Sequence, residues 1–111
     1  MTRQEPLGAS ELTEQAIEEL ETRGWCQGRL ENETGEVCYL GAYEFAMAQL
    51  GVSSWQLYRE AWQASHKEFA ELGGKGTGYD IPAWNDAPGR TKEEVLERMT
   101  LVAKRLRDKG L

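Results

Sequence analysis

The feature that most constrains the fold of this 111-residue chain is a helical repeat between residues 55 and 72. Its mostly apolar members alternate spacings of three and four residues, and they are Trp55, Tyr58, Trp62, Ser65, Phe69 and Leu72. Ser53 and Gln56 have the spacing of a capping box ahead of this repeat, and Gly73 follows it. The pattern predicts one long helix whose aromatic stripe faces the core.

Three further segments have the spacing of amphipathic helices: residues 10–23, residues 41–50 and the residues that follow position 91. Thr91 and Glu94 form a capping box ahead of the last of them. The side chains expected to face the core are Leu12, Ala16, Ile17, Leu20, Phe45, Ala46, Leu50, Val95, Met99, Val102 and Leu106. Four helices are therefore predicted, of which the third and fourth are the longest.

Residues 25–30 and 36–40 are β-capable runs on either side of a loop that contains Asn and Gly. They predict a β-hairpin, which must pack on the helices because an isolated hairpin is marginal in water. Its register is open: one alignment places Cys26 and Cys38 on one face, and the next separates them. We therefore expect an α+β fold, with about four helices and a two-stranded hairpin. Residues 1–9 are expected to be a flexible lead-in, and residues 10–111 one compact domain.

The charge is unevenly distributed: residues 1–36 carry −6, residues 37–89 carry −3 and residues 90–111 carry +3, for a total of −6. An acidic chain gains little from contact with phosphates, which disfavours nucleic-acid binding, although the basic residues 90–109 keep it as an alternative. The longest uncharged apolar stretch, residues 37–43, is far shorter than a membrane-spanning helix. The first residues lack the apolar segment of a secretory signal, so a cytoplasmic protein is expected.

Cysteine chemistry is the first catalytic hypothesis to weigh. Cys26 as nucleophile, His66 as base and Asp86 as orienting acid would form a catalytic triad. His66 is the single histidine of the chain, so it fills the role by default, and a structural cysteine is favoured. A zinc site of Cys26, Cys38, His66 and Asp86 is disfavoured because the two cysteines lack the close spacing of such sites. No metal or cofactor is expected.

The string Trp-Asn-Asp at residues 84–86 suggests a binding site in which a ring stacks on a ligand and polar side chains hydrogen-bond to it. Trp25, Gln27, Trp84, Asn85 and Asp86 are the candidate binding residues. The structural alternative is favoured, because Asn and Asp side chains often bond to nearby backbone in a turn before a capped helix. The glycine-rich residues 73–78 follow a helix instead of a strand, so they are interpreted as a flexible loop and not as a phosphate loop.

Three strings are distinctive in combination: Gly-Trp-Cys-Gln-Gly at 24–28, Val-Cys-Tyr-Leu-Gly-Ala at 37–42, and Trp-Asn-Asp-Ala-Pro-Gly-Arg-Thr at 84–91, followed by Glu94 and Val95. Their order and spacing resemble an uncharacterised family of small proteins from actinobacteria and their phages, known as a domain of unknown function. The resemblance covers about residues 12–103. It implies a cytoplasmic protein of bacterial or phage origin, and it implies no activity.

Three functions remain open. The favoured one is a non-enzymatic accessory protein that binds another protein, because four Trp and four Tyr exceed what a small core needs. Its partner would be a host or phage protein, and self-association is also expected. The second is a small-molecule or nucleotide binder, or a hydrolase, that uses Cys26 and residues 84–86. The third is a nucleic-acid-associated protein that uses residues 90–109.

Overall fold

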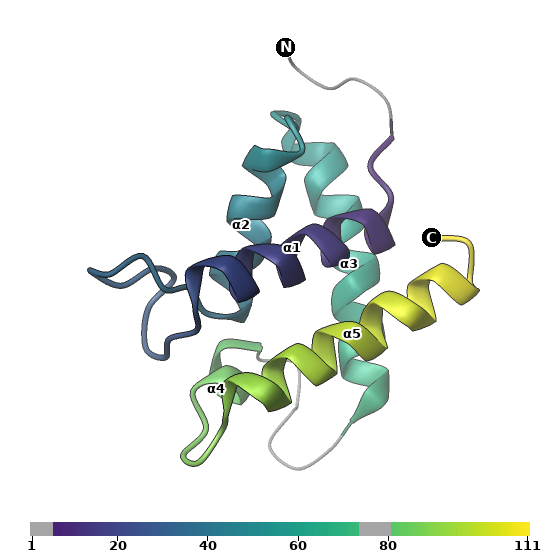
Figure 1. Cartoon of the computed structure of the whole chain (residues 1–111). Coiled ribbons are helices and arrows are strands. Elements are labelled where there is room, and N and C mark those ends of the chain that lie inside the picture. Colours follow the sequence, from purple (N-terminus) through teal and green to yellow (C-terminus); the bar gives the residue numbers. More distant parts are fainter. Residues whose placement is uncertain (1–5, 74–80) are drawn as a thin grey trace.

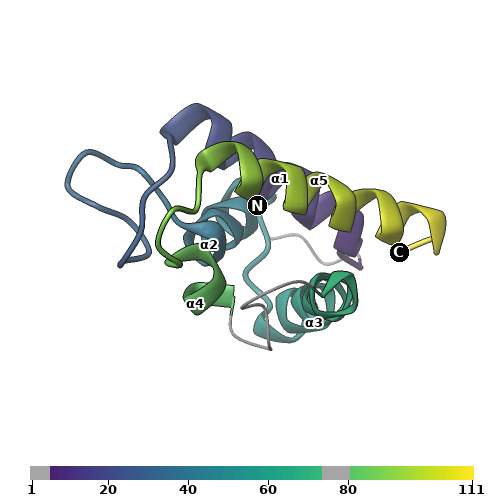
Figure 2. The same ribbon diagram turned by 90° about the horizontal axis from the view of Figure 1, so that it is seen from below.

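The computed structural model describes residues 6–73 and 81–111, and within these ranges the chain forms five α-helices. They are α1 (Ala9–Arg23), α2 (Tyr39–Gln49), α3 (Trp55–Leu72), α4 (Ile81–Asn85) and α5 (Lys92–Asp108). Helices α1 and α5 lie side by side and cross over α2 and α3, while the short α4 lies near the first turns of α5 (Figures 1 and 2). The core lies between these two layers.

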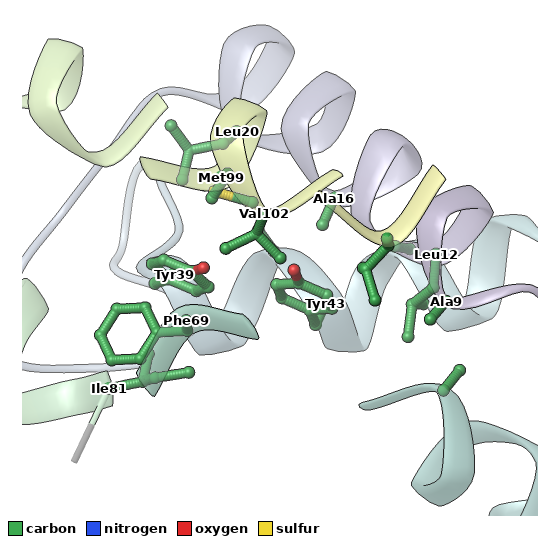
Figure 3. Packing of buried hydrophobic residues seen from close by; sticks show 14 of the residues in the cluster. Ala9, Leu12, Ala16, Leu20, Tyr39, Tyr43, Phe69, Ile81, Met99 and Val102 are labelled. Carbon is green, nitrogen blue, oxygen red and sulfur yellow. The ribbon is translucent and has the colours of Figure 1, made fainter. Parts of the chain in front are cut away.

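The apolar faces of the helices meet in the core largely as their spacing predicts. The α5 side chains Val95, Met99, Val102 and Leu106 are fully buried. So are Leu12, Ala16 and Leu20 of α1, which reach toward the same centre (Figure 3). Leu7 and Ala9, which precede most of α1, also belong to this cluster. Packing against other helices, more than helix propensity, accounts for the stability of helices of this length.

The centre of the core is aromatic. Tyr39 stacks on Tyr43 with ring centroids 5.7 Å apart, and Phe69 and Trp84 approach Tyr39 edge-on. The hydroxyl of Tyr43 lies within hydrogen-bond distance of Thr13 Oγ1 (2.9 Å) and Ser65 Oγ (2.6 Å). These buried polar atoms therefore satisfy one another where α1, α2 and α3 meet.

The predicted hairpin is wrong, and with it the α+β class. Between α1 and α2 the chain forms a loop in which Val37 makes isolated bridges to Trp25, parallel, and to Glu31, antiparallel. The described residues contain no continuous pair of strands. The Val37 amide donates to the Gly24 carbonyl, and the Val37 carbonyl accepts from the Cys26 amide. The next residue, Cys38, donates its amide to the Leu30 carbonyl at the other end of the first run.

Tertiary contacts explain why these residues do not form strands. Residues 27 and 28, in the middle of the first run, bond to Asn85 at the end of α4 and to Asp86 after it, so the first run bonds to the second near its two ends instead of along its length. The second run ends early because Tyr39 begins α2, with Cys38 as N-cap: its Sγ accepts a hydrogen bond from the Gly41 amide. A short helix and its cap thus replace the predicted second strand.

Smaller differences concern caps and turns. The N-cap of α3 is Ser54 instead of Ser53, and its hydroxyl accepts a bond from the Leu57 amide. Thr91 and Glu94 form the predicted capping box of α5. The helix α4 was not predicted, and the predicted flexible loop over residues 73–78 lies, apart from Gly73, outside the described residues.

Among the helices of residues 6–73 and 81–111, none has both the length and the apolar character needed to span a bilayer.

Candidate functional site

The two strings that carry most of the predicted binding residues contact each other directly. Asn85, at the end of α4, is fully buried, and its side chain makes four hydrogen bonds. Its Oδ1 accepts from Trp25 Nε1 (2.7 Å) and from the Tyr39 amide (3.1 Å). Its Nδ2 donates to the Cys26 carbonyl (3.2 Å) and to Asp86 Oδ1 (2.9 Å). An amide side chain has no further strong capacity, so Asn85 is satisfied within the protein.

The neighbouring polar residues extend the same connection. Gln27 Nε2 donates to the carbonyls of Asn85 (3.0 Å) and Ala87 (3.2 Å). The Gly28 amide donates to Asp86 Oδ1 at 2.9 Å. Gln27 and Asp86 are exposed, yet both are directed toward the opposite string. These contacts join the loop after α1 to the end of α4.

We call these contacts between residues 25–28 and residues 85–87 the joint. Trp84 lies next to the joint and is buried in the core. Its ring is 3 % exposed and meets Phe69 edge-on at 5.5 Å. The Arg90 guanidinium lies over the ring at 4.0 Å, and its Nε donates to the Trp84 carbonyl. Cation–π stacking and burial therefore hold this tryptophan in place. The structure thus brings the candidate binding residues close together at the joint, where their polar groups hydrogen-bond within the protein.

A small hollow of about 200 Å³ lies beside this joint, lined by Trp84, Arg90, Glu94, Glu97, Arg98 and Leu101. Its two arginines already have partners. Arg90 pairs with Glu94 at 3.1 Å, and Arg98 donates to the Phe69 carbonyl near the C-terminus of α3, where a cation is favourable. The ligand-binding interpretation of residues 84–86 gains no support from this hollow.

The two cysteines are buried free thiols. The Cys26 thiol donates to the carbonyls of Glu36 (3.3 Å) and Arg29 (3.5 Å). Burial, followed by the nearby Cys38 and Glu36, raises the pKa of Cys26. Burial also raises the pKa of Cys38. A raised pKa leaves less thiolate at neutral pH, which is the opposite of what a nucleophile needs.

The proposed partners of Cys26 have other contacts. His66 lies on α3 between Trp62 and Phe69, with ring centroids 5.8 and 6.3 Å away. Asp86 bonds to Gly28 and Asn85, as described above. Within residues 6–73 and 81–111, no group of three or more His, Cys, Asp or Glu side chains is placed to hold a metal ion. Cys26, Cys38, His66 and Asp86 therefore do not form a metal site within these ranges.

The basic last segment is largely neutralised by ion pairs. Five of its bases pair with carboxylates: Arg90 with Glu94, Lys104 with Asp108, Arg105 and Lys109 with Glu68 and Glu71, and Arg107 with Glu14. Bases that are held by carboxylates of the same chain contribute less to phosphate binding. Two of the acidic partners lie on α3 (Glu68 and Glu71), two on α5 itself (Glu94 and Asp108) and one on α1 (Glu14).

The surface that stands out lies elsewhere, between α2 and the first turns of α3. Trp55 is 67 % exposed, the most of any large apolar side chain among the described residues. It borders a hollow of about 410 Å³ lined by Glu44, Phe45, Met47, Ala48, Trp55 and Tyr58, which we call the Trp55 groove. The groove is mostly apolar, and its floor includes the buried Tyr58.

The helical repeat predicted Trp55 for the core stripe, together with Tyr58 and Phe69, which are buried. Trp55 differs because it is the first residue of α3. A residue in the first turn can extend past the neighbouring helix even when its spacing matches the buried face. The surplus of tryptophan in the composition was the only signal in the sequence for such a contact residue.

Comparisons with known proteins add a family and no activity. A family model described as a family of unknown function (DUF6197) matches residues 4–105. No match was found among curated proteins or among solved structures.

Proposed function

Because the chain belongs to the family of unknown function DUF6197, whose description names no activity, we propose its role from the surface and chemistry of the fold. The chain is a non-enzymatic accessory protein that acts by binding another protein, and the Trp55 groove is its contact surface. A host or phage protein in the cytoplasm is the partner.

The observation that carries this proposal is the exposure of Trp55 beside an apolar hollow. Exposing an indole ring to water is unfavourable, and burying it in a partner recovers about 25 cal/mol for each Å² of apolar surface. Tryptophan is also among the residues that most often dominate the binding energy of protein interfaces. The groove beside it offers space for an apolar side chain of the partner.

The chemistry of the remaining candidate residues supports a role without catalysis. The thiol of Cys26 is directed to backbone carbonyls, and burial raises its pKa. The polar atoms of Asn85 are engaged within the fold. These features favour architecture over a reacting group at the positions that the sequence singles out.

A capture experiment with matched variants tests the proposal. The tagged chain, W55A and L101A are expressed in the source cytoplasm, and the retained protein is purified and titrated against each chain by calorimetry. Leu101 is a suitable control because it is 42 % exposed but lies on α5, outside the groove. We expect a stoichiometric partner whose affinity falls about tenfold or more in W55A and stays unchanged in L101A.

Two results would contradict this function. One is the absence of any stoichiometric partner, and the other is a partner that binds W55A as tightly as it binds the unmodified chain. Far-UV circular dichroism of each variant shows whether the fold is retained.

A further inference from the structure

We propose that in the free protein a second copy of this chain covers the Trp55 groove. Trp55 of each copy enters the groove of the other, and Arg59 of each copy pairs with Glu44 of the other. The inference rests on the contact surface proposed above but not on the existence of a foreign partner. It says what occupies that surface when the chain is alone.

The projecting Trp55 and the hollow beside it lie next to each other on the same chain. Trp55 provides the projecting side chain, and Phe45, Met47, Ala48 and Tyr58 provide apolar walls for one. A twofold interface is self-complementary, because residue i contacts residue j and j contacts i. A chain that carries both parts side by side meets this requirement, and each contact then occurs twice.

Two exposed charges, Glu44 and Arg59, lie close to Trp55. Glu44 is exposed on the lining of the groove, and it forms no ion pair with any base in residues 6–73 and 81–111. Arg59 is exposed one helical turn after Trp55 and likewise has no carboxylate within ion-pair distance in the described part of the chain. Residues four apart share a helix face, so Arg59 accompanies Trp55 into a partner.

These two charges have complementary positions. Arg59 lines a second hollow of about 320 Å³ on Trp55, together with Gln56, Glu60 and Gln63. Trp55 borders both hollows, so Glu44 lies in one hollow, and Arg59, with Glu60 beside it, lies in the other. An occupant of the Trp55 groove needs an apolar projection with a base beside it to match Glu44. The chain itself offers that combination, which favours a second copy as the occupant.

The first test measures mass in solution. Sedimentation velocity of the whole chain over a wide concentration range should show a reversible monomer–dimer equilibrium. W55A should raise the dissociation constant about tenfold or more, because central tryptophans dominate such interfaces. L101A should leave it unchanged. A chain that stays monomeric at the highest concentration, or a W55A dimer of undiminished affinity, overturns the proposal.

The second test exchanges the charges. E44R and R59E should each weaken the dimer about tenfold, because each places like charges opposite one another in both halves of the interface. The double variant E44R/R59E should restore it. An equimolar mixture of the two single variants should also restore it, since every facing pair in that heterodimer is opposite in charge. E18R, which reverses an exposed acid of α1 outside the groove, is the control.

The outcomes separate this inference from the proposed function. If neither the double variant nor the mixture recovers the dimer, the reciprocal pairing is wrong whatever foreign protein is captured. A series of growing oligomers instead of a dimer also overturns it, because a head-to-tail contact does not close. A dimer with no foreign partner leaves this inference standing and removes the proposed function. A monomer that captures a partner through Trp55 does the reverse.

Discussion

At the scale of single residues, Asn85 has the largest structural role among the candidate residues. Its side chain joins Trp25, 60 positions earlier in the sequence, to the first residue of α2 and to the loop backbone. Buried polar groups are costly when they lack partners, so a fully satisfied amide at this point favours one arrangement of the two strings. Asp86 is next to it in sequence but is exposed.

Replacing Asn85 by Ala should therefore destabilise the fold strongly. The substitution leaves Trp25 Nε1, the Tyr39 amide and the Cys26 carbonyl without their partner, and we expect a loss of about 3 kcal/mol in the free energy of unfolding. D86A, which removes an exposed acceptor, should cost about 1 kcal/mol. Urea denaturation measures both, and an N85A loss no larger than that of D86A would contradict the role of Asn85.

At the scale of elements, close backbone approach decides the path between α1 and α2. A Cβ atom on Gly41, in the first turn of α2, would collide with the carbonyl oxygen of Leu30. Gly28 has φ +85°, a conformation that favours glycine, but has open space around its Cα. The two glycines thus serve different purposes: one permits contact between the loop and the helix, and the other permits a turn of the backbone.

The substitutions G41A and G28A separate these purposes. G28A should cost about 1 kcal/mol, since it only places a Cβ in a left-handed conformation. G41A should cost about 3 kcal/mol, because the loop or the helix must move to admit the methyl group. Chemical denaturation of the two variants side by side gives the comparison. Equal losses would show that steric contact with Leu30 does not limit this position.

The α3–α5 contact depends on a buried carboxylate. Glu68 is 1 % exposed and accepts bonds from Lys109 Nζ (2.7 Å) and Arg105 Nε (2.9 Å). Burial raises the pKa of Glu68, but the hydrogen bonds from Lys109 and Arg105 outweigh burial and hold the pKa below its usual value. A lowered pKa stabilises the fold above the unfolded pKa of about 4.3, and this stabilisation is lost as the pH falls through the folded pKa.

We expect E68Q to lower the free energy of unfolding by about 2 kcal/mol at neutral pH, where hydrogen bonds to a charged acceptor are lost. The difference from the unmodified chain should shrink as the pH falls below about 4. Glu71 approaches the same two bases at 3.5 and 3.9 Å but is half-exposed, so E71Q is the matched control and should cost about 0.5 kcal/mol. Urea titrations at both pH values test this, and a loss in E68Q that is independent of pH would contradict it.

At the scale of the whole molecule, one core contains buried tyrosines from both α2 and α3. Burial raises the pKa of Tyr43 to about 12. Burial also raises the pKa of Tyr39 and of Tyr58, the latter with a further contribution from Glu44. Tyr39 and Tyr43 lie among the clustered apolar side chains (Figure 3), and Tyr58 belongs to the same cluster, so ionising any of them would place a charge in apolar surroundings.

Stability should therefore fall steeply in alkali. In the unfolded chain tyrosines lose their protons near pH 10, while the folded chain keeps them, so the unfolded state binds fewer protons. The free energy of unfolding then decreases as the pH rises, by up to about 4 kcal/mol per pH unit for three such groups. We expect tyrosinate absorbance to appear together with the loss of helical circular dichroism. Y58F should reduce the slope by about a third, and early ionisation of the intact fold would contradict this account.

Much of the helical architecture was determined by local sequence. The apolar spacing of α1 and α5, the capping box at Thr91 and the glycine after α3 are contained within a few turns of chain, and they predicted the corresponding helices closely. Local chemistry suggested bonds from residues 84–86 to nearby backbone, whereas Asn85 and Asp86 bond to Trp25, Tyr39, Cys26 and Gly28, which lie 46 to 60 positions away. The family resemblance is confirmed by the match over residues 4–105.

Only the tertiary structure decided the rest. The runs at 25–30 and 36–40 have β-capable residues, yet Gln27 and Gly28 bond to residues about 60 positions away, and Cys38 caps a helix. A pattern read from a few neighbouring residues does not include partners so far away in the sequence, and for this reason the predicted hairpin was wrong. For the same reason the Trp55 groove could not be predicted, because Trp55 and Tyr58 belong to one apolar stripe in the sequence. Which ring is buried depends on its place along the folded helix: Tyr58 lies nearly one turn inside α3 and is buried, whereas Trp55 is the first residue of α3 and is 67 % exposed.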